Sequence, residues 1–121
     1  MSDLKRWPVK YIRDGAKSAY KKDIECYVCG INKNLELHHT HSISQLFKNY
    51  CNTAGIRIEK LEDILQHRDQ FIDQHRKEIY EDVYTLCKIC HLRLHKLFGQ
   101  RPALVTASKQ STWLDKLKEK V

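Results

Sequence analysis

Two Cys-x-x-Cys pairs constrain this 121-residue chain more than any other feature of its sequence. Cys26 and Cys29 form the first pair, and Cys87 and Cys90 form the second. Four thiolates at this spacing can complete a tetrahedral zinc shell, and Gly30 supplies permissive backbone for the turn around the metal. A zinc ion held in this way couples metal binding to folding. The sequence therefore predicts a small fold stapled by a structural zinc ion.

Other roles for the cysteines fit the sequence less well. A redox dithiol would need a surrounding βαβ pattern, which neither pair has. Disulfides are disfavoured because residues 1–10 are charged and lack the hydrophobic stretch of a secretory signal. The fifth cysteine, Cys51, is expected to be a buried small hydrophobe. We therefore expect an intracellular, cytoplasmic protein with reduced thiols and no membrane-spanning segment.

Two short strands and a helix are predicted next to the cysteine pairs. Apolar and polar residues alternate over Leu35–His39, which predicts a strand, and the β-branched and aromatic residues 83–86 predict the returning strand. A helix is expected directly after the second pair and should end at Gly99. His91 and His95 are four residues apart, so this helix places both imidazoles on one face. That spacing is typical of metal ligands.

Further helices are predicted between the strands and at both ends of the chain. Apolar residues recur every three or four positions over about residues 58–78, so we expect an inserted amphipathic helix there. A basic, partly helical arm is expected over residues 1–23, and a C-terminal helix over about residues 106–121. The hydrophobic content of 41% suffices for one small α+β domain over residues 1–121, with its core at about 24–99.

The charge of the chain favours an acidic polymer as partner. Lys and Arg number 22 against 15 Asp and Glu, and the net charge is +7. Charge alone is weak support for nucleic-acid binding, because many basic domains are merely soluble. Basic residues around His91 could neutralise DNA phosphates, namely Lys88, Arg93 and Lys96. For the N-terminal arm, a solvated face and a contact with the DNA backbone are equally compatible with the sequence.

Taken together, these segments resemble the HNH nucleases, also called ββα-metal or His-Me finger nucleases. The resemblance covers about residues 26–98 and rests on the strand ending in His38 and His39, on residues 81–91, and on His95. The four cysteines match the members of that family that are built on a zinc-bound treble clef. The resemblance implies a zinc-stabilised ββα-metal core and a metal-dependent DNA endonuclease. The small size is similar to that of free-standing HNH endonucleases of phages and mobile elements.

The resemblance also implies a role for each histidine of these motifs. His39 would be the general base that takes a proton from the attacking water, and His38 would be a ligand of the catalytic metal. His91 would be the second ligand, and His95 a third ligand or a phosphate contact. Neighbouring strand residues point to opposite faces, which supports this division between His38 and His39. Imidazole ligands accept several ions, so Mg²⁺, Mn²⁺, Ni²⁺ and Zn²⁺ all stay open.

Asp82 occupies a position at which the HNH family most often has asparagine. Its expected task is to fix the loop and orient His39, by accepting a hydrogen bond from the imidazole. Two alternatives are that the carboxylate reaches the metal or that the activity is reduced. The residue type does not choose among these three.

Two other functions compete with DNA hydrolysis. The first is a non-catalytic zinc-finger module that binds DNA or regulates on the same scaffold, and the second is metal handling or redox chemistry by the thiols. DNA is the expected partner of the endonuclease and of the zinc-finger module. The sequence leaves the choice between a monomer and a homodimer open, and it does not distinguish nicking from double-strand cleavage.

Overall fold

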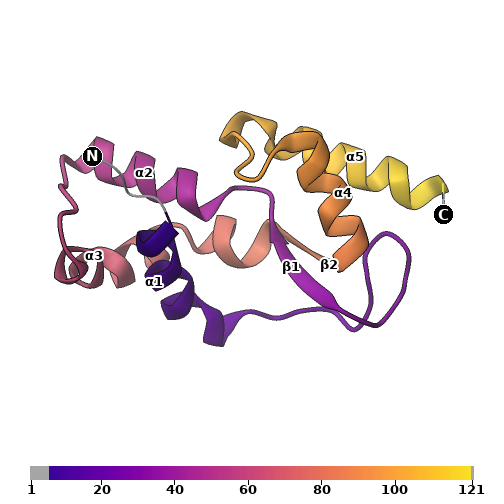
Figure 1. Cartoon of the computed structure of the whole chain (residues 1–121), viewed down its shortest axis with the longest axis horizontal. Helices are drawn as coiled ribbons and strands as arrows, with labels where there is room; N and C mark the ends of the chain where they lie inside the picture. The colour runs from indigo at the N-terminus through magenta and orange to yellow at the C-terminus, as the bar shows by residue number, and fades with distance from the viewer. Residues whose placement is uncertain (1–5, 121) are drawn as a thin grey trace.

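The structure, a computed structural model, describes residues 6–120, with side chains from residue 10 onward. A two-stranded antiparallel sheet lies between two groups of helices (Figure 1). Strand β1 spans Leu35–His39 and strand β2 spans Val83–Cys87. The predicted α+β class is confirmed at this level. The parts of the predicted terminal arms at residues 1–5 and 121 lie outside the described residues.

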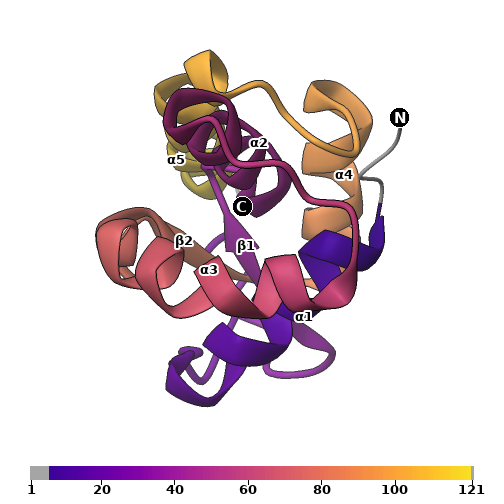
Figure 2. The ribbon, with the colours of Figure 1, turned by 90° about the vertical axis from the view of Figure 1, so that its left-hand side faces the viewer.

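Three helices form the first group, which faces the viewer in Figure 2. They are α1 (Arg6–Ala16), α2 (Ile43–Ala54) and α3 (Leu61–Gln74). Their apolar faces share one core with the turn that follows α3, and Cys51 lies in it, as predicted. The buried members of this core are Ile12, Ala16, Ile43, Leu46, Phe47, Cys51, Ile64, Phe71, Ile72 and Ile79.

The sequence pattern had predicted one continuous helix over about residues 58–78. The structure shows two separate elements instead. Helix α3 ends at Gln74, and a separate π-helical turn, Lys77–Glu81, leads into β2. Periodicity of apolar residues does not report this break, because Ile79 keeps the apolar spacing of the helix and is fully buried although it lies in the π-helical turn. The turn matters for the site, since it presents the carbonyl of Ile79 toward the end of β1.

The second group consists of α4 (Lys88–Phe98), α5 (Ala107–Lys120) and the loop that carries the first cysteine pair. Gly99 has φ of 94° and ends α4, as expected. The C-terminal helix begins within about a residue of its predicted start, after a 3₁₀ turn at Leu104–Thr106. Leu114 of α5 is fully buried against the cysteine-bearing loops. Among the described residues, no helix combines the length and the apolar character that crossing a membrane requires.

Candidate metal centres and active site

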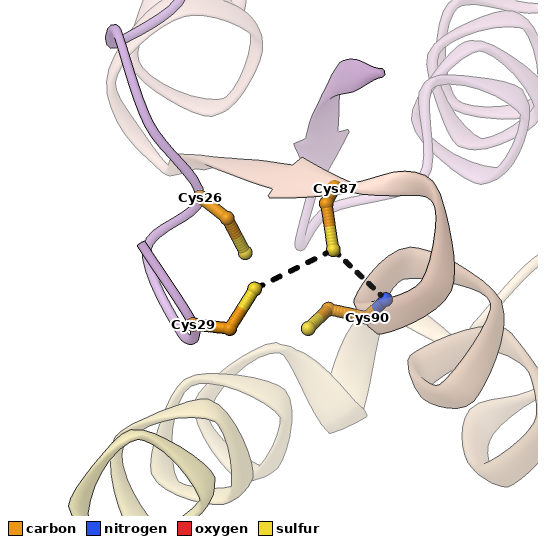
Figure 3. A group of neighbouring side chains, drawn as sticks. All are labelled: Cys26, Cys29, Cys87 and Cys90. Carbon is orange, nitrogen blue, oxygen red and sulfur yellow. Dashed lines mark hydrogen bonds between the residues drawn. The ribbon is translucent and has the colours of Figure 1, made fainter. Parts of the chain in front are cut away.

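Four cysteine side chains converge where the loop before β1 lies beside the end of β2 and the first turn of α4 (Figure 3). Cys26 and Cys29 come from the loop before β1, whereas Cys87 ends β2 and Cys90 lies in α4. All four sulfur atoms are within 4.8 Å of one another, and Cys29 Sγ is 3.7 Å from Cys87 Sγ. The structure thus brings the two predicted pairs into one tetrad.

The surroundings of the four thiols favour ionisation of one of them, Cys26. Burial opposes ionisation of Cys26, but backbone N–H groups, including those of Cys29 and Cys87, outweigh it and lower the pKa of Cys26 to about 7. Burial, together with hydrogen bonds to Cys87 and Cys26, raises the pKa of Cys90. Four sulfur donors with this closeness suit a soft tetrahedral cation. The cluster could therefore bind zinc.

Three histidines form a second cluster, which also involves α4. His38 comes from β1, and His91 and His95 come from successive turns of α4. His38 Nδ1 lies 3.1 Å from His91 Nε2, and His95 Nε2 lies 3.0 Å from the same atom. These three ring nitrogens therefore face a common point. The resemblance had implied His38 and His91 as ligands, and His95 as a third ligand or a phosphate contact.

The outward-facing nitrogens of the two α4 histidines have acceptors of their own. Glu36 Oε1 is 2.7 Å from His91 Nδ1, and the carbonyl oxygen of Gly99 is 2.8 Å from His95 Nδ1. An acceptor at one nitrogen fixes the proton there, so the other nitrogen presents its lone pair. Both Nε2 atoms are thus prepared to act as ligands.

His38 is oriented in the same way by a glutamine from α5. Gln110 Oε1 lies 2.7 Å from His38 Nε2, while Gln110 Nε2 donates to the carbonyl of Thr40 and to Thr106 Oγ1, both at 3.0 Å. Because the amide nitrogen has two acceptors, the amide oxygen must be the atom that faces His38. The proton of His38 then lies on Nε2, and its Nδ1 presents the lone pair to the cluster.

The chemistry of this triad fits a divalent cation. Three lone pairs directed at one point repel one another unless a cation lies between them. Burial lowers the pKa of His38 to about 3 and also lowers that of His91, so both are neutral, which is the form that binds metals. Three ligands leave further coordination positions open to other groups. The histidines could therefore hold a metal ion such as zinc.

His39 lies on the opposite face of β1 from His38, in contact with the π-helical turn. Its Nε2 is 2.9 Å from the carbonyl oxygen of Ile79, and its ring centroid is 5.3 Å from that of Tyr20. Burial lowers the pKa of His39 to about 4, and the nearby Arg13 guanidinium contributes in the same direction. A neutral His39 that donates from Nε2 keeps the lone pair of Nδ1 available for a proton.

One cavity of about 240 Å³ contains both His39 and the three histidines of the cluster. It lies between the N-terminal arm, the hairpin and the segment after α4. Its lining residues are Arg13, Tyr20, Leu37, His38, His39, Ser42, Ile43, His91, His95, Gln100 and Pro102. Two imidazoles from opposite faces of β1 and two from α4 therefore reach the same small space.

Asp82 does not take the position expected from the sequence. Its carboxylate accepts two hydrogen bonds from Lys77 Nζ, at 2.9 and 3.1 Å, and lies 3.5 Å from His41 Nδ1. The hydrogen bond expected between Asp82 and His39 is replaced by the one to the carbonyl of Ile79. The reason is the π-helical turn, which directs the Asp82 side chain toward His41 and away from the histidine cluster.

Among the other predicted residues, Lys88, Arg93 and Lys96 lie exposed on α4. Sequence reasoning missed the groups that orient the histidines. Glu36 could have been found, because it is two residues from His38 in a strand and shares its face. No pattern in the sequence points to Gln110, which reaches His38 across 72 positions of the chain.

Comparison of the sequence with known protein families places the chain in the class of endonucleases. A family model described as the nicking endonuclease family, and named for phage T5, matches residues 2–121. The chain belongs to this family. No solved structure matches it. Membership implies a nuclease that acts on DNA, which confirms the predicted class of enzyme.

Proposed function

We propose that the chain is an HNH-type nicking endonuclease that hydrolyses one phosphodiester bond of DNA by means of a histidine base and one divalent metal. The observation that carries the proposal is the convergence of three oriented imidazoles beside a half-buried, neutral His39 in one cavity. The order of β1, β2 and α4 supports a ββα-metal core, and the cysteine tetrad would supply its structural zinc ion.

Metal would be held by His38 Nδ1, His91 Nε2 and His95 Nε2. A divalent ion supplies polarisation of the scissile phosphate and stabilises negative charge on the leaving oxygen. The chain's own contribution is to fix the three lone pairs in place through Glu36 and Gln110. Imidazole donors suit Mn²⁺, Ni²⁺ and Zn²⁺ more than Mg²⁺, which prefers oxygen ligands.

His39 acts as the general base of the reaction. Its Nδ1 accepts a proton from the attacking water while the water oxygen bonds to phosphorus and the bond from phosphorus to the leaving oxygen breaks. The Nε2 proton stays on the imidazole, and the carbonyl of Ile79 stabilises the resulting positive charge. The low pKa of His39 keeps the base in its neutral form before the reaction.

Asp82 acts at a distance from the chemistry. Its ion pair with Lys77 joins the two ends of the π-helical turn, and its carbonyl accepts hydrogen bonds from Thr40 Oγ1 at 3.0 Å and from the Thr40 N–H at 3.3 Å. These contacts hold the turn that presents Ile79 to His39. Asp82 is therefore a positioning residue for the base.

The decisive experiment is nicking of supercoiled plasmid by the zinc-loaded protein with added Mn²⁺, Ni²⁺ or Mg²⁺. We expect open-circular product that His39→Ala abolishes and that His67→Ala, a control on α3 away from the cavity, leaves unchanged. DNA binding is measured on the same samples by gel shift. Binding without any nicking, equal in all three proteins, would refute hydrolysis and favour the non-catalytic zinc-finger module.

A further inference from the structure

A second, larger cavity of about 1010 Å³ adjoins the one that contains the histidines. It lies between α1 and the segment that follows α4, and four of its lining residues are basic: Lys10, Arg13, Lys17 and Arg101. We propose that this space, the α1 groove, binds the phosphate backbone of the strand that is cut. This inference rests on the proposed function, since it concerns how DNA reaches that site.

The four cations of the α1 groove are available to an external anion. Asp14 is the acidic residue that shares the groove with them. None of the four has a carboxylate partner within the described part of the chain, where the basic residues of the neighbouring helix α3 and its turn, Arg68, Arg76 and Lys77, are paired. Unpaired cations that gather in a groove attract a polyanion, and DNA phosphates are the anions an endonuclease meets.

Packing of α1 determines which of its residues face the α1 groove. Ile12 and Ala16 of α1 are fully buried in the first helical core, whereas Lys10 and Arg13 of α1 are exposed, as is Lys17 in the 3₁₀ turn Lys17–Ala19 that follows. Lys10, Arg13 and Lys17 recur at three- and four-residue steps, which places them on one face of the segment. The sequence had left open whether this arm is a solvated face or a DNA contact, and the groove favours the contact.

The α1 groove is continuous with the cavity that contains the histidines. Arg13 and Gln100 line both cavities, so a strand in the groove would pass from the cations of α1 to His39 without leaving the lined surface. Tyr20 lines the histidine cavity, and its hydroxyl is buried and has no hydrogen-bond partner among the described residues. A phosphate oxygen or its water entering the cavity would satisfy this hydroxyl.

The test compares three triple variants that each remove three positive charges from the zinc-loaded full chain. The groove variant is K10Q/K17Q/R101Q, the helix variant is K88Q/R93Q/K96Q, and the control is K109Q/K116Q/K120Q on the exposed side of α5. Arg13 stays unchanged because it also lines the histidine cavity. All three variants are made in the H39A background, which separates binding from hydrolysis.

Binding to a fluorescent duplex is measured by anisotropy as a function of salt. Each lost phosphate contact lowers the slope of log affinity against log salt by about 0.9, so the groove variant should lose about 2.7 from the slope, and the control much less. Equal slopes for the groove and control variants would overturn the proposal, as would a loss confined to the helix variant. Failure of the parent protein to nick plasmid would refute the proposed function alone, because the slopes do not depend on cleavage.

Discussion

Removal of the Gln110 amide should weaken metal binding at the histidine cluster although Gln110 touches no metal. In Gln110→Ala, the Nε2–H of His38 loses its acceptor and the carbonyl of Thr40 loses a donor. Without the acceptor, the proton of His38 is free to move to Nδ1, which is the nitrogen required as a ligand. The imidazole ring also loses the contact that holds its orientation.

The magnitude of this effect follows from the burial of the pair. Loss of such an outer hydrogen bond lowers metal affinity by about 10- to 100-fold. His38 and Gln110 are 2% and 0% exposed, so water cannot replace the missing partners. Each buried group left unpaired costs about 1–3 kcal/mol of folding free energy, so two groups cost about 2–6 kcal/mol. We therefore expect a loss of stability together with the loss of affinity.

The assay is competition for Ni²⁺ between the zinc-loaded protein and a fluorescent chelator, at a temperature at which circular dichroism shows the variant folded. Thr112→Ala is the matched control, because Thr112 is exposed on the same helix and its hydroxyl donates to the carbonyl of Ser108. Gln110→Glu keeps an oxygen facing His38 and should retain more affinity than the alanine variant. Equal nickel affinity in Gln110→Ala and Thr112→Ala would refute the reasoning.

Three further predictions test other parts of the structure. Zinc removal by a strong chelator should unfold the chain, and circular dichroism that does not change after verified zinc loss would contradict this. Burial raises the pKa of Cys51 to about 11 from an ordinary 9.0. Its thiolate fraction, and with it the rate of thiol labelling in the folded protein, should therefore still rise above pH 9. A labelling rate that reaches a plateau near pH 9 would show an exposed thiol. Asp82→Asn should slow nicking far less than His39→Ala, since the Asp82 side chain bonds to Lys77 and the proposed base, His39, bonds to the carbonyl of Ile79. Equal losses of nicking in the two variants would show that the Asp82 carboxylate takes part in the reaction.

The features predicted correctly from the sequence are those encoded locally. Chelation requires short spacings, so the cysteine pairs and the four-residue step from His91 to His95 are visible in the chain itself. Alternation along β1 likewise separates His38 from His39 before any tertiary contact is known. In each of these cases the geometry of one helix, strand or turn carries the information.

The features that the sequence did not reveal depend on tertiary contacts or on backbone groups. A carbonyl has no residue signature, so the bond from His39 to Ile79 could not be anticipated, and family position suggested Asp82 instead. Gln110 and Arg101 reach their sites through packing of segments far apart in the chain. The π-helical turn left no trace in the apolar pattern, because it buries the same isoleucine that a continuous helix would bury.

Helix α4 contributes residues to both candidate metal centres, and Cys90 and His91 are neighbours in it. A single peptide unit thus connects the cysteine tetrad to the histidine triad. A metal ion that orders this turn of α4 at one centre therefore also orders the neighbouring residue of the other centre. Affinities that share such an element are thermodynamically linked, and the linkage is reciprocal. Zinc occupancy should therefore set the nickel or manganese affinity of the histidines, and those ions should slow zinc release by the same free energy. The newly made chain would then become able to cut DNA only after it had bound zinc, so the zinc supply of the cell would control the activity.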